Sequence, residues 1–365
     1  MPSPVARLFR AALLAALVLA MLVCGLAVLA VAGSETGPVA FGLAVGLAVL
    51  PVPVYLAVVL FIDRYEPEPV RMVALTFAWG ATIAAFVAIV LNTVGEVVVS
   101  ESLGADAAEL YGYSISAPIV EESAKGFVLF GIFWLFRREF NGVVDGIVYA
   151  ALVGLGFAMT ENVLYYGRGA VEDGIPGAVG TFVVRGLLSP FAHPIFTAMT
   201  GIGLGVATVA RSPFVRTVAP LIGLGLAMAL HSLWNTSAGS GLFFGVYVLI
   251  FVPVLGAIGI IVVLGLRREG RVIARQLNGV LPPGEVVALS SLRARRAWRR
   301  EAARRGGRQA KKAMIDLQHA AAEVAFLREQ VERGTVPRSP ATLAREASLA
   351  TVVTQRRHQL TSLTG

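Results

Sequence analysis

The chain has 365 residues, of which 56% are hydrophobic and 15% are charged, and its mean hydropathy is +0.74. This composition excludes an ordinary water-soluble domain and indicates a membrane protein. The lone cysteine, Cys24, excludes an intramolecular disulfide framework and a cysteine-based metal site, so that His, Glu, Asp or Asn side chains must hold any metal.

The net charge of +8 is divided unevenly along the chain. Residues 1–266 hold 11 basic and 15 acidic side chains, whereas residues 267–365 hold 20 and 8. We therefore predict two units, a hydrophobic body over residues 1–266 and a basic tail over residues 267–365.

The body contains eight apolar stretches that can each cross a bilayer, which takes about 20 residues. They lie at residues 11–32, 39–62, 70–94, 114–136, 143–166, 189–209, 214–237 and 242–266. We predict an all-α fold, a polytopic transmembrane bundle of about eight helices with a mostly helical cytoplasmic tail. The first stretch also resembles a cleaved signal peptide, but its apolar run of about 22 residues favours a retained helix.

The arginines predict which helix ends face the cytoplasm. If the N-terminus lies inside, the outer loops carry only Arg168. The cytoplasmic ends and loops then carry Arg7, Arg10, Arg64, Arg71, Arg137, Arg138, Arg211 and Arg216, followed by the basic tail. Because positive residues favour the cytoplasmic side of a membrane, we expect both termini in the cytoplasm.

Three carboxylates fall near the outer end of these predicted helices. Glu121 and Glu122 come early in a helix that starts outside. Glu161 lies 18 residues after Val143 in a helix that starts inside, which places it about 27 Å across a core roughly 30 Å thick. Ionisable groups are costly in a bilayer, so these three indicate a functional site.

Two histidines and an amide are expected at the same depth. Ser189 and Pro190 are typical of a helix start, which puts His193 in the first turn of a helix entering from outside. His231 and Asn235 come late in a helix that starts inside. Four helices therefore deliver polar groups to one level near the outer face, and we infer that they meet around one cavity.

The spacing of these residues predicts their chemistry. Glu121 and Lys125 are four residues apart and share a helix face, whereas Glu122 points about 100° away. Lys125 can hold one carboxylate while the other acts as a general base. The neutral imidazoles can bind a metal or stabilise an oxyanion, and Asn235 can assist in either role.

Five motifs in this order resemble one protein family. Residues 121–125 read as EExxK, 156–162 as GFxxxEN and 231–235 as HxxxN, and they accompany the segments DRYEPEP (63–69) and FNGVVDG (140–146). Together, over about residues 50–240, they are similar to the PrsW family of bacterial intramembrane proteases. That family in turn resembles the CAAX prenyl endopeptidases and bacteriocin-processing enzymes.

The resemblance implies peptide-bond hydrolysis in a bacterial plasma membrane, with Glu121, Glu122 and the histidines as active residues. It implies a membrane-anchored protein substrate, such as an anti-sigma factor, cut on its extracytoplasmic side. Family members are classed as metallopeptidases, but related enzymes have been explained by a glutamate-activated water, so zinc is an open expectation. Its candidate ligands are His193, His231 and Glu161. Where relatives often have FxxxH, this chain has Phe157 and Glu161.

Other interpretations of the same residues remain open at this point. The EExxK residues can form a structural ion cluster, and Glu161 can reach outward to headgroup water. A proton-coupled transporter or sensor would use the same carboxylates and imidazoles as a relay, and a catalytically silent scaffold would need none of them. The segment 63–69 is expected to be a rigid turn with solvated carboxylates.

The tail suggests partners of its own. Ten basic residues lie within 293–312, which favours contact with anionic lipid. Apolar residues repeat at steps of three and four over residues 310–331, which is typical of a short coiled coil or of a helix that binds a cytoplasmic partner or a second copy. A solvated helix is the alternative. We expect no nucleic-acid binding, because no reading motif accompanies the arginines.

Overall fold

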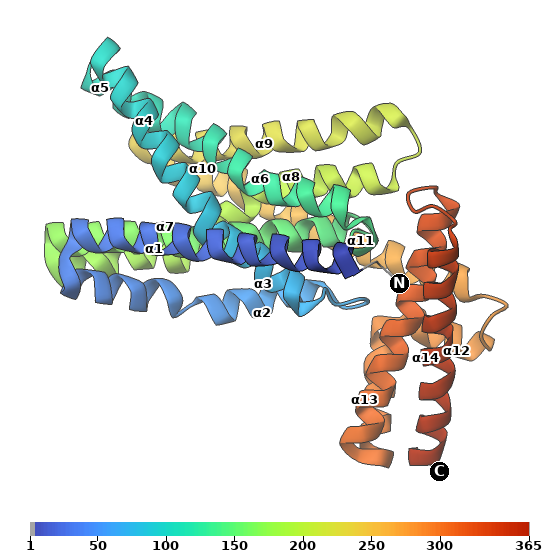
Figure 1. The fold of residues 1–365 in the computed structure, drawn as a ribbon. Helices are drawn as coiled ribbons and strands as arrows, with labels where there is room; N and C mark the ends of the chain where they lie inside the picture. The colour runs from blue at the N-terminus through green and yellow to red at the C-terminus, as the bar shows by residue number, and fades with distance from the viewer. Residues whose placement is uncertain (1–3, 365) are drawn as a thin grey trace.

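The computed structural model describes residues 4–364, so residues 1–3 of the predicted body and residue 365 of the predicted tail lie outside the described residues. Within residues 4–364 the chain is helical and contains no β-strand. Figure 1 shows an elongated bundle with the tail helices standing across one end. The predicted all-α polytopic bundle is confirmed.

Fourteen α-helices occur in the described part of the chain. Their bounds are α1 Pro4–Val49, α2 Val52–Ile62, α3 Val70–Trp79, α4 Ala85–Leu103, α5 Ala105–Tyr111, α6 Ala117–Leu135, α7 Val143–Thr181, α8 Ala192–Val209, α9 Pro213–Gly239, α10 Phe243–Val246, α11 Val252–Leu277, α12 Pro283–Ser290, α13 Leu292–Glu332 and α14 Pro340–Thr364. Short π-helical segments, including η1 (Gly80–Ala84), η2 (Gly112–Ser116) and η4 (Phe182–Leu188), continue some of these helices.

Three of the long helices, α1, α7 and α13, are interrupted at a glycine, and the breaks in α1 and α7 lie within the bundle. Gly37 in α1 has φ 74° and Gly174 in α7 has φ 68°, a backbone region that favours glycine. Pro38 and Pro176 follow them. Figure 1 shows α1 folding back at the end of the bundle far from the tail. The reversal at Gly37 separates the first two predicted spans.

Five helical stretches are long and apolar enough to cross a membrane. They are Ala11–Ile62, Val70–Leu103, Val143–Val209, Pro213–Gly239 and Phe243–Leu277, and they contain seven of the eight predicted stretches. The eighth, in α6, carries Glu121, Glu122 and Lys125 and falls outside this set. The chain is therefore a membrane protein, and the number of crossings stays a prediction.

Helix α7 forms the centre of the bundle and packs closely against α8. A Cβ atom on Gly146 would lie 2.1 Å from the carbonyl oxygen of Gly201, and one on Gly201 would lie 2.1 Å from that of Gly146. Residues 144–158 of α7 are all buried. The glycines thus let two helix backbones touch, as expected for tightly packed membrane helices.

The tail helices form a hydrophobic core with the end of α11. Leu317 and Val324 of α13 belong to one buried cluster with Leu349 and Val353 of α14 and with Ile273 of α11. The apolar stripe at 310–331, predicted to bind a partner or a second copy, is therefore buried within this chain instead. Helix α14 covers it, a pairing that the stripe itself did not reveal. Helix α11 runs without a break across the predicted unit boundary at residue 266.

The loop at 63–69 differs from the expectation of solvated carboxylates. Asp63 is only 7% exposed, and Glu66 and Glu68 are partly buried. The tail covers this loop, because Arg295 Nη2 donates to the carbonyl oxygen of Tyr65 at 2.8 Å and Arg295 is itself buried. One member of the basic run thus anchors the tail to the bundle instead of facing solvent.

Candidate active site

Six of the seven predicted site residues meet in one buried cluster. Helix α6 supplies Glu121, Glu122 and Lys125, whereas α7, α8 and α9 supply one side chain each. These three are Glu161, His193 and His231, which hydrogen bonds or ion pairs connect to the α6 residues or to one another. The structure therefore brings together the groups that the sequence placed at one depth.

Lys125 is the centre of the cluster. Its Nζ donates to Glu122 Oε1 at 2.8 Å and to Glu121 Oε2 at 3.3 Å, so it holds both carboxylates. It also lies 3.0 Å from His193 Nδ1 and 3.9 Å from the centre of the Phe157 ring. Lys125 is completely buried, and these partners compensate the cost of its charge.

The two adjacent glutamates have different surroundings. Both oxygens of Glu122 are engaged, Oε1 by Lys125 and by His231 Nδ1 at 3.1 Å, and Oε2 by Thr197 Oγ1 at 2.9 Å. Glu121 instead lines a cavity. Thr197 had no signal in the sequence, since a threonine on an apolar helix is common. Glu121 is therefore the carboxylate that a molecule in the cavity can reach.

His193 is held from both sides. An ammonium group can only donate, so His193 Nδ1 accepts from Lys125, and the Nε2–H donates to Glu161 Oε2 at 2.7 Å. Glu161 also forms an ion pair with Arg185, whose Nε donates to Asn162 Oδ1 at 2.9 Å. Arg185 comes from η4, and the reversal at Gly174 brings it back onto α7.

The start of α8 sets the position of His193. The helix begins at Ala192, two residues later than Ser189 and Pro190 suggested, and His193 still lies in its first turn. A Cβ atom on Gly154 of α7 would lie 2.8 Å from the backbone nitrogen of Pro194. The bare glycine therefore lets the first turn of α8 approach α7 and brings His193 within reach of Glu161.

His231 faces Glu121 with its second nitrogen. Because a carboxylate accepts, the Nδ1–H of His231 donates to Glu122, and Nε2 carries the lone pair. Nε2 lies 3.8 Å from Glu121 Oε2. Two acceptors that face each other call for a proton donor or a cation between them, such as a water molecule or a metal ion.

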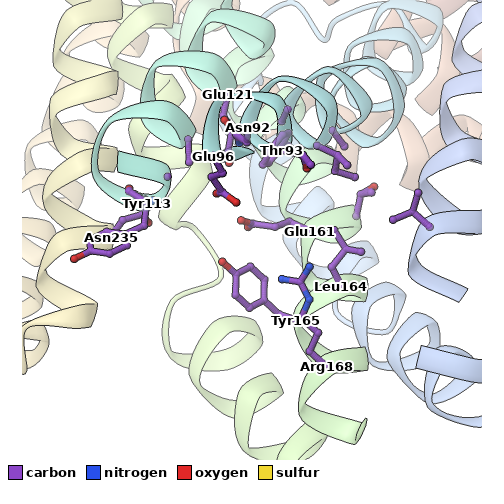
Figure 2. Close-up of a pocket in the computed structure, with 18 of the residues that line it drawn as sticks. Asn92, Thr93, Glu96, Tyr113, Glu121, Glu161, Leu164, Tyr165, Arg168 and Asn235 are labelled. Atoms are coloured by element: carbon purple, nitrogen blue, oxygen red, sulfur yellow. Dashed lines mark hydrogen bonds between the residues drawn. The ribbon is translucent and has the colours of Figure 1, made fainter. Parts of the chain in front are cut away.

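Asn235 is placed differently from the other predicted residues. Its Nδ2 donates to the carbonyl oxygen of Tyr113 at 2.9 Å, so it fastens α9 to η2. It lines the same cavity as Glu121 and Glu161. Figure 2 shows Asn235 at the far side of the cavity from Glu161. It is thus a wall residue and not a member of the Lys125 cluster.

The cavity has a volume of about 440 Å³, within the range of ligand pockets, and lies between α1, α4, α6, α7 and α9. Figure 2 shows Asn92, Thr93 and Glu96 of α4 on its wall. Sequence reasoning did not single these out. Their spacing of three and four was the available signal, since it forms a polar strip along an otherwise apolar helix.

The donor atoms partly suit a metal ion. Glu121, His193 and His231 offer ligand atoms that all lie within 4.8 Å of one another, and two histidines with a glutamate are the ligands of several catalytic zinc sites. Glu121 is thus the third candidate ligand, the role predicted for Glu161. Glu161 orients His193 instead. Lys125, however, already uses the His193 lone pair. The residues fit a metal provided that it displaces the Lys125 ammonium group.

Comparison with known proteins gives a consistent family. A family model described as PrsW family intramembrane metalloprotease matches residues 68–258, just over half of the chain. A protein named Protease PrsW from Geobacillus kaustophilus is 35% identical over 151 residues, which is 40% of this chain and 59% of that relative.

Two more relatives carry the same name. The one from Bacillus subtilis is 34% identical over 145 residues, 40% of this chain and 60% of its own length. The one from Halalkalibacterium halodurans is 32% identical over 127 residues, 34% of this chain and 51% of its own length. The chain thus spans less than two thirds of these curated relatives. No solved structure matches it significantly.

Proposed function

Because the chain belongs to the PrsW family of intramembrane metalloproteases, we propose that it is an intramembrane endopeptidase. Its substrate is a membrane-anchored protein, such as an anti-sigma factor, which it cuts near the extracytoplasmic face. The observation that carries this proposal is the position of Glu121, which lines the cavity and lies 3.8 Å from the His231 lone pair.

In this proposal Glu121 is the general base. It takes a proton from a water molecule, whose oxygen attacks the carbonyl carbon of the peptide bond. A C–O bond forms, the C–N bond breaks, and the proton passes to the leaving amine. Removal of a general base typically costs about 10²–10⁴-fold in rate.

The remaining residues position this base and the peptide. Glu122 has no free oxygen for proton transfer, since Lys125, His231 and Thr197 engage both of its oxygens. It therefore orients His231. Glu161 and Arg185 orient His193. Asn235, which keeps one Nδ2–H after its bond to Tyr113, is the group proposed to stabilise the carbonyl oxygen as it gains negative charge.

A zinc ion, if bound, would be held by Glu121, His231 and His193, and Glu121 would then be a ligand instead of the general base. When bound, such an ion supplies a Lewis acid that polarises the peptide carbonyl. Glu161 would then act as the outer partner that fixes the ring of His193, in the arrangement common for metal-bound histidines.

The arrangement of the helices supports a site near the outer face of the membrane. Helix α7 starts beside the tail, where Gln330 Nε2 donates to Asn141 Oδ1 at 2.7 Å. Glu161 lies 18 residues after Val143, the first residue of α7, which corresponds to about 27 Å along the helix. If the basic tail faces the cytoplasm, as the positive residues favour, this distance puts the site near the outer face. This supports a cut close to the extracytoplasmic surface.

The transporter interpretation requires a polar path through the bundle. Between Tyr149 and Glu161, α7 presents Leu152, Val153 and Leu155, all buried and apolar. Because these residues separate the polar loop near the tail from the Lys125 cluster, the geometry favours a one-sided site over a proton relay.

A purified-component experiment tests the proposal. The protein and a Glu121→Gln variant are placed in lipid vesicles with membrane proteins from a host cell, and new N-termini are mapped by mass spectrometry. We expect fragments with the unchanged protein and with Glu101→Gln, an exposed residue of α4, but not with Glu121→Gln. Identical fragments from all three proteins would reject the proposal.

A further inference from the structure

Glu96 is a carboxylate on the cavity wall that the proposed mechanism does not use. It lies on α4, one turn after Asn92, and lines the same cavity as Glu121 and Glu161. Figure 2 shows its carboxylate pointing into the cavity, between Tyr113 on one side and Glu161 on the other. A bound peptide that reaches Glu121 would therefore pass it.

The other charged groups of this cavity already have partners. Arg168 pairs with Glu35 at 3.3 Å, and Arg185 pairs with Glu161. Glu121 pairs with Lys125 at 3.3 Å. Arg185 is further held by Asn162 and by the ring of Tyr165, 3.8 Å away. Both cavity arginines thus have a carboxylate partner within the structure.

Glu96 stands apart in this charge balance. No cation pairs with it among residues 4–364, and its side chain is exposed. One negative charge therefore remains uncompensated in the cavity. The Glu96 carboxylate therefore stabilises a bound group most if that group carries a positive charge.

A glycine on the neighbouring segment determines where the Glu96 carboxylate lies. A Cβ atom on Gly112 of η2 would lie 2.4 Å from Glu96 Oε1. The bare backbone at Gly112 leaves room for the side chain to cross η2. Tyr113 and Trp234 line the same cavity, and aromatic faces attract cations.

We infer that Glu96 forms a subsite for a cationic side chain, a lysine or arginine close to the bond that is cut. The inference rests on the proposed function for its biological meaning, but the subsite can be tested as a binding site alone. It predicts a substrate class: membrane-anchored proteins with a basic residue next to the cleavage position.

The first experiment measures binding without cleavage. The probes are two fluorescent alanine-rich hexapeptides that differ only in one central residue, arginine or glutamate, and the protein is the full chain in detergent. We expect the arginine peptide to bind roughly three- to tenfold more tightly. Glu96→Gln should remove this difference, and Glu101→Gln, on the same helix but outside the cavity, should retain it.

A second variant tests the position of the Glu96 carboxylate instead of its charge. Gly112→Ala keeps Glu96 but pushes its carboxylate aside, so the preference for arginine should weaken. Equal affinity for the two peptides in the unchanged protein, or the same loss of preference in Glu101→Gln, would overturn the inference.

The second experiment separates the inference from the proposed function. Single-pass membrane reporters carry lysine, glutamine or glutamate at one position of the outer juxtamembrane stretch. The inference expects faster cleavage with lysine than with glutamate by about tenfold, and a reversed order with Glu96→Lys. Cleavage that ignores the charge contradicts the inference and leaves the protease intact. A peptide preference without any cleavage contradicts the protease and supports the subsite.

Discussion

Lys125 Nζ lies 3.0 Å from His193 Nδ1 and thereby fixes the protonation pattern of that ring. Because the ammonium group cannot accept, the ring proton must sit on Nε2 and point at Glu161. The EExxK motif thus controls a histidine that is 68 residues away in the sequence. This contact joins the carboxylates of α6 to the histidine of α8.

Arg185 is expected to matter through Glu161. The Arg185→Gln change removes the ion pair with Glu161, which then holds His193 less firmly. We expect the cleavage rate to fall about 10–100-fold, as for other outer partners of catalytic histidines. The matched control is Arg168→Gln, which breaks an exposed pair with Glu35 and should change the rate little. Equal effects of the two changes would contradict this role.

Gly154 is predicted to set the distance between α7 and α8. In Gly154→Ala the new methyl group meets the backbone of His193 and Pro194 at 2.8–2.9 Å. Such overpacking should lower the free energy of unfolding by about 1–3 kcal/mol and slow cleavage by moving His193. Gly225→Ala in α9 meets nothing within 4 Å and serves as the control. Thermal unfolding in detergent measures both, and an unchanged midpoint for Gly154→Ala would contradict the prediction.

Zinc affinity should depend on residues that do not bind zinc directly. Glu161→Gln leaves Glu121, His193 and His231 in place but weakens the hold on the His193 ring, so that affinity should fall about 10–100-fold. Lys125→Gln removes the group that competes for the His193 lone pair and should raise affinity. Competition with a coloured chelator gives both values. Zinc affinity must fall in Glu161→Gln and rise in Lys125→Gln. Equal affinities in the two variants would count against Glu121, His193 and His231 as the ligands.

The loop at 63–69 should make stability depend on pH. Burial and the negative charge of Glu323 raise the pKa of Glu66 well above its usual value of 4.5. The folded protein therefore holds this proton more tightly than the unfolded chain does. The stability that Glu66 contributes is complete below pH 4.5 and is lost as the pH rises through the raised pKa.

Thermal unfolding between about pH 5 and about pH 8 measures this effect. The unfolding midpoint should fall more steeply with pH in the unchanged protein than in Glu66→Gln, which cannot ionise. Glu101→Gln should behave as the unchanged protein does. Parallel curves for the unchanged protein and Glu66→Gln would show that this carboxyl does not titrate with folding.

The depth of the site could be predicted because helical rise is constant. Counting residues along apolar stretches placed Glu121, Glu161, His193 and His231 at one level, and the structure brings them together. The rotation of each helix about its axis could not be derived in this way. The sequence therefore left open which of Glu121 and Glu122 faces the cavity.

The sequence also did not reveal contacts that form because the chain turns back, or because another segment packs over a surface. Arg185 reaches Glu161 because the chain turns back at Gly174. The loop carboxylates are buried because the tail folds over them, and α14 covers the stripe at 310–331. Periodicity reports that a helix has an apolar face, but it does not report which segment packs against that face.

Glu121 is proposed to activate a water molecule for peptide hydrolysis. The most direct measurement is cleavage of a membrane reporter in water labelled with heavy oxygen, followed by mass spectrometry of the new C-terminus. We expect one labelled oxygen atom in the new carboxyl group with the unchanged protein, and a loss of product of about 10²–10⁴-fold with Glu121→Gln. Labelled product formed at an unchanged rate by Glu121→Gln would contradict this proposal.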